Sequence, residues 1–184
     1  MLLAARRAPA TLVGCTVYGL ALVLMYASST AYHVTPCERP RTKHALHVLD
    51  HSAIFLLISG TYTPLALTVL HDTRGYLLLG LVWALSFFGL YLVIMRRNPR
   101  RGGPILLYLV IGWVVALTLP DLMRTLGNRA LLLLLSGGAL YTLGVPFYAL
   151  RSLRYHHAIW HGFVLVGSAL HFVAIFEFVI PYSK

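Results

Sequence analysis

The sequence predicts an all-α integral membrane protein, built as a single polytopic bundle of six transmembrane helices. Apolar residues make up 59% of its 184 residues and charged residues only 11%, whereas a soluble domain is about half apolar and a quarter charged. The mean hydropathy is +0.77. The apolar residues form runs long enough to cross a bilayer, and short polar segments separate these runs. The length suffices for one compact bundle and leaves no room for a separate soluble domain.

The first two runs have clear boundaries. The first run is too long for the apolar region of a signal peptide, and it ends in Ser-Ser-Thr-Ala-Tyr-His rather than in small residues that would mark a cleavage site. The second run contains Pro64, which predicts a kinked helix whose freed backbone groups bond to nearby threonines. The six spans are predicted at residues 10–34, 45–70, 75–95, 102–119, 130–150 and 157–181.

Later spans are bounded by charged and proline-containing segments. A basic loop at residues 96–101 closes the third span, and Pro120-Asp121 is predicted to end the fourth. A second basic loop, residues 151–156, precedes the sixth. The fifth span is rich in small residues, which allow close packing between membrane helices. These residues are Gly137, Gly138, Ala139 and Gly144.

The net charge of +10 comes from fifteen Lys and Arg against five Asp and Glu. In a chain this apolar, arginines in short loops indicate topology and contacts with anionic lipids, and they do not indicate nucleic-acid binding. One set of loops carries nine basic residues and the other set six, so the positive-inside rule favours the first set as cytoplasmic, with both termini outside. The nine are Arg39, Arg41, Lys43, Arg96, Arg97, Arg100, Arg101, Arg151 and Arg154.

The two cysteines, Cys15 and Cys37, lie in the middle of the first span and just beyond its end. These positions do not suit a disulfide framework. The sequence also lacks a CxxC or cysteine-rich zinc pattern.

A histidine pair marks the entrance to the last span. His157 and His161 are four residues apart, so they share one face of a helix and both rings can reach one metal ion. Histidine side chains are energetically costly inside a membrane, so a pair of them at the edge of a membrane helix indicates a function. Interfacial histidines bonded to headgroups would give the same spacing, so the pair alone leaves metal binding open.

Other polar residues fall on the same predicted side of the membrane. His33 lies at the end of the first span and Asp50 at the start of the second. Three histidines with one open position are the ligands of a catalytic zinc, whereas four ligands indicate a structural one. Such a zinc activates water as a nucleophile, and Asp50 is a candidate general base. Ser29, four residues before His33, could donate a hydrogen bond to a developing oxyanion.

Several alternatives compete with this interpretation. Asp50 could instead pair with a loop cation such as Arg41 or Lys43. A rival metal site would use His47, His51 and Asp50, because the two histidines form a second four-residue pair. Two further histidines are set aside. His156 is rotated off the face of His161, and His171 lies ten residues beyond His161, about 15 Å along the helix, so it is predicted to bond to a neighbouring helix.

Three motifs carry a resemblance that spans nearly the whole chain. They are Ser28-Ser29-Thr-Ala-Tyr-His33, Asp50-His51 leading to Gly60-Thr-Tyr-Thr-Pro64, and His157-Ala-Ile-Trp-His161. This ordered set resembles the hemolysin III family, which is grouped with the adiponectin and progestin receptors and is more distantly similar to the alkaline ceramidases. The resemblance implies zinc bound by His33, His157 and His161, with Asp50 and Ser29 beside it. The family has seven helices, and the first span here matches its second helix, so the resemblance implies a bundle without the family's first helix.

The predicted function follows from the site and the resemblance together. We expect a zinc-dependent hydrolase at the cytoplasmic leaflet of the plasma (inner) membrane, acting on an amide or ester of a membrane lipid. The ceramide-like substrate class comes from the resemblance alone. Two other classes of function remain open, a zinc-stabilised receptor or sensor without turnover and a membrane-damaging, cytolytic protein.

Overall fold

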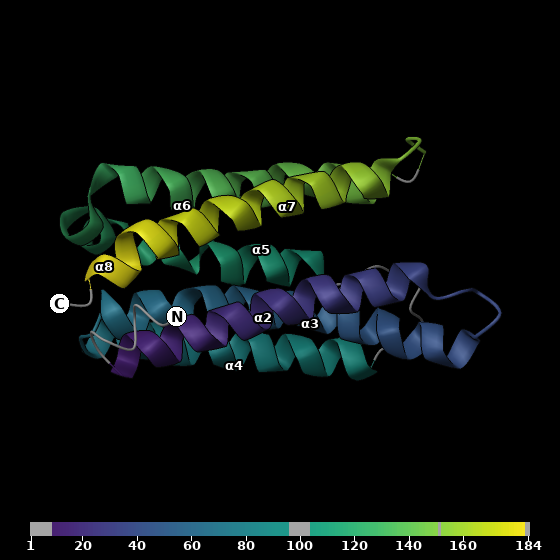
Figure 1. Cartoon of the computed structure of the whole chain (residues 1–184), viewed down its shortest axis with the longest axis horizontal. Helices are drawn as coiled ribbons and strands as arrows, with labels where there is room; N and C mark the ends of the chain where they lie inside the picture. The colour runs from purple at the N-terminus through teal and green to yellow at the C-terminus, as the bar shows by residue number, and fades with distance from the viewer. Residues whose placement is uncertain (1–8, 96–103, 151, 183–184) are drawn as a thin grey trace.

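The computed structural model describes residues 9–95, 104–150 and 152–182, and these are helical with no strand. The helices run along one long axis, with α2, α3 and α4 packed together on one side, α6 and α7 on the other, and α5 between them (Figure 1). The all-α class predicted from composition is therefore confirmed. The elements are α2 (Pro9–Val34), α3 (Pro40–Thr68), α4 (Thr73–Met95), α5 (Ile105–Trp113), the short 3-10 helix η1 (Val114–Thr118), α6 (Leu119–Ala149), α7 (His156–Ala174), the π-helical η2 (Ile175–Val179) and α8 (Ile180–Tyr182).

Four of the described helical stretches are long and apolar enough to cross a membrane. They confirm an integral membrane protein. Helix α3 is not among them, because its first half carries Lys43, four histidine or aspartate positions and a serine that lower its hydropathy. The division into six spans stays a prediction. The four stretches are Pro9–Val34, Thr73–Met95, Ile105–Ala149 and His156–Val179.

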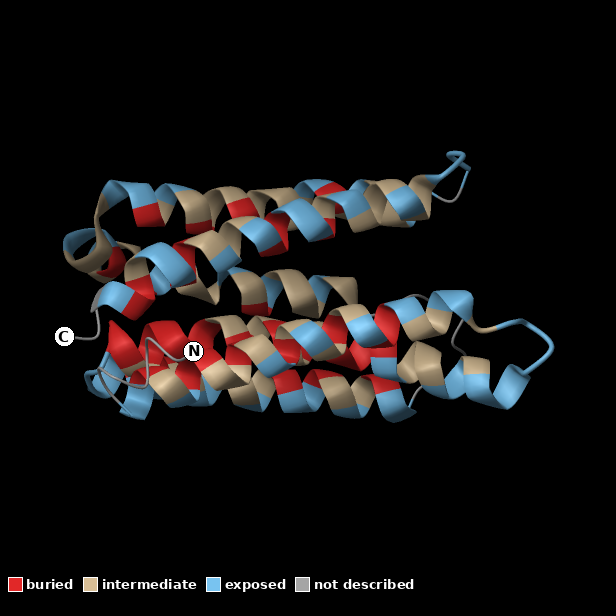
Figure 2. Cartoon of the chain, viewed as in Figure 1, coloured by how far each residue is buried: buried red, intermediate tan, exposed pale blue. Residues whose placement is uncertain are grey.

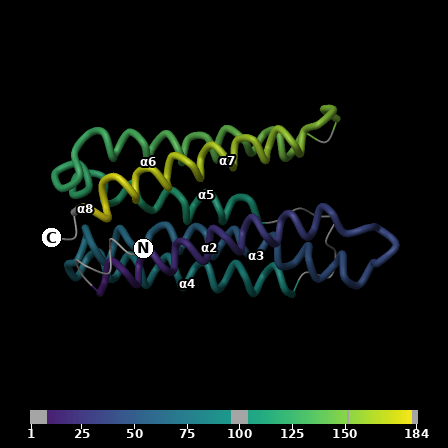
Figure 3. Tube along the Cα trace, in the orientation of Figure 1, coloured from purple at the N-terminus to yellow at the C-terminus, as the bar shows by residue number. Residues whose placement is uncertain are grey.

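The chain reverses its direction between Ile105 and Ala149, and it does so later in the sequence than predicted. Pro120 was predicted to end a span, but it lies in the first turn of α6, where its missing N–H leaves no hydrogen bond unmade. The break comes later, at Gly127, whose φ of 80° and ψ of 175° are non-helical. Glycine tolerates this conformation because it has no Cβ. The chain then runs back along the bundle, as the trace in Figure 3 shows.

Glycines allow two pairs of helices to pack closely, α2 with α3 and α6 with α7. A Cβ on Gly14 would lie 2.7 Å from the Pro64 Cα, so α2 contacts the backbone of α3 there. On the other side of the bundle, a Cβ on Gly144 would lie 2.9 Å from the Trp160 ring, and one on Gly137 2.5 Å from the His171 ring. The small residues of the fifth span therefore do allow close packing, as predicted. Gly138 is different, because nothing lies within 4 Å of its Cβ position.

The outer surface of the bundle is apolar. Figure 2 shows buried residues concentrated where the helices face one another, and exposed residues on the outer faces. Many large apolar side chains are exposed there, among them Leu20, Leu77, Phe87 and Leu106. Such a surface fits contact with lipid tails, since lipid is as apolar as these side chains.

The described chain begins and ends at the same end of the bundle. Helix α2 starts where α8 finishes, and the opposite end holds the C-terminus of α2 and the start of α7 (Figure 1). Helix α7 begins after Tyr155, whose φ of 64° places it in the left-handed region. This turn sends α7 back against α6. As a result, residues near position 33 and residues near position 157 lie at one end of the molecule.

Candidate metal centre

Three imidazoles meet where α2 ends and α7 begins. His33 lies in the last turn of α2, and His157 and His161 occupy successive turns at the start of α7. The His33 Nε2 lies 3.1 Å from the Nε2 atoms of both His157 and His161, and these two nitrogens are 3.0 Å apart. Among the described residues, this is the group of three histidine, cysteine or acidic side chains that could hold a metal ion.

The triangle of nitrogens cannot be explained by hydrogen bonds alone. A neutral imidazole nitrogen is either a donor or an acceptor, and a protonated ring has only donors. Three mutual contacts would need a donor opposite an acceptor along every side of the triangle. With three members this is impossible, because at least two of the nitrogens must be of the same kind. One of the three close contacts is therefore unfavourable unless a cation lies among the nitrogens.

The dimensions of the triangle suit a zinc ion. Zinc–nitrogen bonds are about 2.0–2.1 Å long, so three Nε2 atoms 3.0 to 3.1 Å apart are close enough for all of them to bind one ion. The chemistry of the donors also fits, since neutral imidazole is the commonest protein ligand of zinc. His33, His157 and His161 would therefore hold the ion as three protein ligands.

Asp50 and Ser29 lie beside the histidines. Both side chains are buried, at 7% exposure each. The Ser29 hydroxyl is within hydrogen-bonding range of the Asp50 carboxylate, and the His33 and His157 rings are near enough to interact with that carboxylate electrostatically. The five residues named by the sequence as site residues therefore gather in one place, from three helices. Their roles stay predictions.

The alternative predicted for Asp50 was an ion pair with a loop cation such as Arg41 or Lys43, but among the described residues the ion pair of Asp50 is with His51. The Asp50 Oδ2 lies 3.5 Å from the Nδ1 of His51. Lys43 instead donates to the carbonyl oxygens of Tyr32 and Thr35, at 2.5 and 2.8 Å. The ammonium therefore caps the C-terminal end of α2, where a positive charge is favourable.

In the alternative metal site of His47, His51 and Asp50, the ring nitrogens of His51 bond to other groups of the protein. The His51 Nδ1 contacts the His47 carbonyl oxygen at 3.0 Å, and its Nε2 contacts the Tyr148 hydroxyl at 3.3 Å. The rings of His47 and His51 are stacked, with centroids 4.1 Å apart. Both ring nitrogens of His51 thus bond within the protein, and His51 joins α3 to α6 near the site. His156 also lies outside the triangle, with Nδ1 3.2 Å from the Phe147 carbonyl oxygen.

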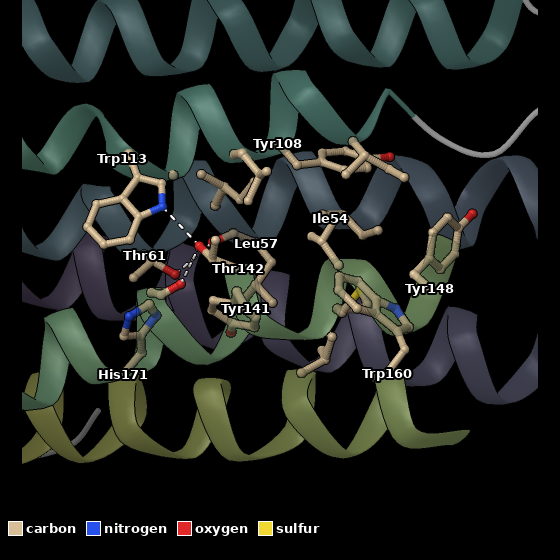
Figure 4. Close-up of a pocket in the computed structure, with 18 of the residues that line it drawn as sticks. Ile54, Leu57, Thr61, Tyr108, Trp113, Tyr141, Thr142, Tyr148, Trp160 and His171 are labelled. Atoms are coloured by element: carbon tan, nitrogen blue, oxygen red, sulfur yellow. Dashed lines mark hydrogen bonds between the residues drawn. The ribbon is translucent and has the colours of Figure 1, made fainter. Parts of the chain in front are cut away.

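A cavity extends from this site along the bundle. It holds about 1380 Å³ of space between the helices, including space open to the outside, and most of its lining is apolar. Tyr148 and Trp160 lie at one end of the cavity (Figure 4). The Tyr148 ring lies 6.1 Å from the His157 ring and its hydroxyl bonds to His51, so the lining residues Asp50, His157 and His161 lie at this end. Trp113 and His171 lie at the other end (Figure 4). His171 was predicted to bond to a neighbouring helix, and its Nε2 is 3.0 Å from the Leu134 carbonyl oxygen of α6.

Sequence reasoning missed the aromatic residues of the cavity. Tyr108 donates to the His51 carbonyl oxygen at 2.9 Å, and Tyr148 stacks at a tilt against Trp160, with centroids 5.4 Å apart. Trp160 lies inside the His157–His161 motif, so its position beside the histidines was a usable signal. Tyr108 and Tyr148 carried no such signal, because aromatic residues in membrane helices usually serve packing.

The fold and the site together define a class, an all-helical integral membrane protein with a three-histidine cluster at one end of an apolar cavity. Residues 1–172 match the family described as Haemolysin-III related, and the chain therefore belongs to the haemolysin III family. This confirms the resemblance drawn from the three motifs.

Individual relatives agree with this assignment. The chain is 38% identical over 169 residues to Hemolysin-3 of Bacillus cereus, a match that covers 92% of this chain and 76% of that protein. It is also 38% identical over 169 residues to the Hemolysin-3 homolog of Bacillus subtilis (strain 168), covering 92% and 78%. The Monocyte to macrophage differentiation factor of Homo sapiens is 27% identical over 168 residues, covering 89% and 69%. No solved structure matches the chain.

Proposed function

We propose that this protein is a zinc-dependent hydrolase that cleaves an amide or ester bond of a membrane lipid. The observation that carries the proposal is the set of three Nε2 atoms, 3.0 to 3.1 Å apart, at one end of an apolar cavity. His33, His157 and His161 would hold the ion. Zinc, when bound, supplies a Lewis acid that polarises a carbonyl oxygen and activates water. Three protein ligands rather than four favour a catalytic over a structural role.

Asp50 would move protons in this reaction. Its carboxylate is buried among apolar and histidine side chains, and it would accept a proton from the attacking water and pass it to the leaving group. Ser29 is within hydrogen-bonding range of this carboxylate and would hold it in position. The Ser29 hydroxyl would also be available to a developing oxyanion. Asp50 and Ser29 would both act on a substrate carbonyl group and a water molecule lying beside the three histidines.

The cavity provides a place for the apolar part of the substrate. An acyl chain lying between α3, α5, α6 and α7 would be surrounded by residues such as Ile54, Leu57 and Val164. An acyl chain that enters from the bilayer would exchange one apolar environment for another, so placing it in this cavity would cost little. A chain held there would place its carbonyl group at the histidine cluster, where the cavity ends.

A second function is favoured by one comparison, because the relative from Bacillus cereus is named Hemolysin-3. The two functions predict different results with purified protein in liposomes. As a hydrolase, the wild type should release fatty acid from a lipid amide or ester, and His157→Ala should abolish the release. As a cytolysin, the wild type should release a trapped dye, and His157→Ala should leave this leakage unchanged. Retained zinc with neither activity would favour a receptor or sensor.

We also propose that the histidine cluster lies at the cytoplasmic leaflet of the plasma (inner) membrane. The basic residues Arg39, Arg41 and Lys43 follow His33 by a few positions, and the positive-inside rule places such loops in the cytoplasm. These cations would also contact the anionic lipids of that leaflet.

Cysteine labelling should report this orientation. Cys37 is exposed in the loop after α2, whereas Cys15 is buried and provides an internal control. A membrane-impermeant maleimide is expected to label Cys37 in inside-out vesicles and to leave right-side-out vesicles unlabelled. The variant Cys37→Ser should remove the label. Labelling of right-side-out vesicles instead would place the histidine cluster at the outer leaflet.

A further inference from the structure

We infer that the lipid bound in the cavity carries a hydroxyl group on its acyl chain, about twelve to fourteen carbon–carbon bonds from its carbonyl group. His171 and Thr61, at the end of the cavity remote from the histidine cluster, would accept a hydrogen bond from this hydroxyl. The inference rests on the proposed function, because it takes the three-histidine cluster as the place where the carbonyl group lies.

The remote end of the cavity is unusually polar for its surroundings. Thr61 of α3, Trp113 of α5, Thr142 of α6 and His171 of α7 come together there (Figure 4), although the rest of the lining is mostly apolar. Four helices thus each contribute a polar side chain to one small region. Trp113 is 39% exposed, and Thr61, Thr142 and His171 are partly buried. A histidine within a membrane helix, such as His171, marks a candidate functional site.

The donors in this region are already used. The Thr61 and Thr142 hydroxyls each donate to the carbonyl oxygen four residues earlier on their own helix, at 2.8 and 2.9 Å. The Trp113 Nε1 donates to the Thr142 oxygen at 3.0 Å. Thr142 therefore has both a donor and an acceptor bond, whereas the Thr61 oxygen keeps lone pairs that can accept.

His171 adds an acceptor. Its Nε2 is 3.0 Å from the Leu134 carbonyl oxygen, which can only accept, so this nitrogen carries the proton. In the neutral ring Nδ1 is then an acceptor, and none of the hydrogen bonds among the described residues uses it. The edge of the ring formed by Cδ2 and Nε2 packs against α6, because a Cβ on Gly137 would lie 2.5 Å from Cδ2. The opposite edge, with Nδ1, faces away from α6.

Of these four described side chains, Thr61 and His171 therefore keep an acceptor, and none keeps a donor. A ligand that ends there in a methyl group would leave these acceptors without partners in an apolar site, which is unfavourable. A ketone would fail for the same reason, since it brings another acceptor. A hydroxyl group brings the missing donor and fits. A trapped water could also supply a donor, and the experiment below separates this case.

Helix geometry sets the position of the hydroxyl along the chain. His171 is ten residues beyond His161 on the same helix, α7, a rise of about 15 Å, and the cluster between His157 and His161 lies about 3 Å further. Side chains lean the same way along a helix, so their tips keep this spacing. An extended chain advances about 1.25 Å per carbon–carbon bond. About twelve to fourteen bonds span the distance.

Binding of fatty acids, the products of the proposed hydrolysis, tests the inference without relying on turnover. The probes are octadecanoic acid, the same acid with a hydroxyl or a ketone on its thirteenth carbon, and the acid with a hydroxyl on its sixth carbon. We expect zinc-loaded wild type to bind the thirteenth-carbon hydroxy acid about five- to tenfold more tightly than the other three acids. Competition measured by native mass spectrometry would report the ratio.

Two variants identify the residues responsible. His171→Leu should abolish the preference and leave the zinc content unchanged, and Thr61→Val should reduce the preference, which keeps the test decisive if His171→Leu folds poorly. Phe172→Leu, at the adjacent exposed position, should behave as wild type. Equal affinities for all four acids, as a trapped water would give, would overturn the inference alone. Failure of zinc-loaded protein to bind any of the acids would overturn the lipid-hydrolase proposal as well.

Discussion

Replacing His161 or His33 by alanine is expected to abolish stoichiometric zinc binding, with a loss of affinity well above about 100-fold. Removal of partners that only orient zinc ligands costs about 10- to 100-fold, and loss of a ligand should cost more. Each nitrogen of the triangle lies within 3.1 Å of the other two, so neither of the remaining pair can compensate for a missing member. Metal analysis of purified protein after exposure to a competing chelator would measure the loss.

Two histidine variants serve as matched controls. His156→Ala removes a ring that contacts the Phe147 carbonyl oxygen, and His47→Ala removes a member of the rival site. Both should keep one zinc per chain. Equal zinc in all variants would show that the triangle does not bind the metal, and loss of zinc only in His47→Ala would move the site to α3.

Zinc should also stabilise the bundle, since it joins the end of α2 to the start of α7. A ligand bound to the folded state alone raises the free energy of unfolding by mass action, by about 4 kcal/mol at a thousand times the dissociation constant. A chelator should therefore lower the melting temperature of the wild type and leave that of His33→Ala unchanged. The same chelator should have little effect on either protein if the histidines serve only packing.

The substitution Asp50→Asn is expected to lower the rate of lipid hydrolysis by about 10²- to 10⁴-fold, the usual contribution of a general acid–base group. Asparagine has nearly the same shape and can still bond to the Ser29 hydroxyl, but it cannot accept a proton from water. Zinc content should remain at the wild-type level, because Asp50 is not a member of the triangle. The measurement is fatty acid release at saturating zinc.

The stability of Asp50→Asn separates a catalytic from a structural role. If Asp50 mainly held α3 in place through His51, 3.5 Å away, the melting temperature would fall in parallel with the activity. We expect the activity to fall and the melting temperature to change little. Ser29→Ala should have a smaller effect on the rate, because it removes a hydrogen bond and leaves the carboxylate. An unchanged rate in Asp50→Asn would contradict the proposed mechanism.

Much of the fold could be predicted from local sequence. Helix α2 was predicted at residues 10–34 and is observed at Pro9–Val34, and α4 was predicted at 75–95 and is observed at Thr73–Met95. These boundaries follow from hydropathy, which depends only on neighbours along the chain. The reversal after α5 was misplaced because Pro120 was taken as a stop, although a proline in the first turn of a helix is compatible with it. The sequence contains fifteen glycines, and nothing in it distinguishes Gly127 as the one that adopts a positive φ.

The sequence by itself determined the membrane class, the shared face of His157 and His161, and the small residues at helix contacts, because each depends on composition or on spacing within one helix. Only the tertiary structure decided that the His33 ring closes a triangle with that pair, that both ring nitrogens of His51 bond elsewhere, and that polar groups from four helices meet at the remote end of the apolar cavity. The bonds of His33 to His157 and of His51 to Tyr148 join residues more than 90 positions apart. Their distances are set by how whole helices pack, which no local pattern encodes.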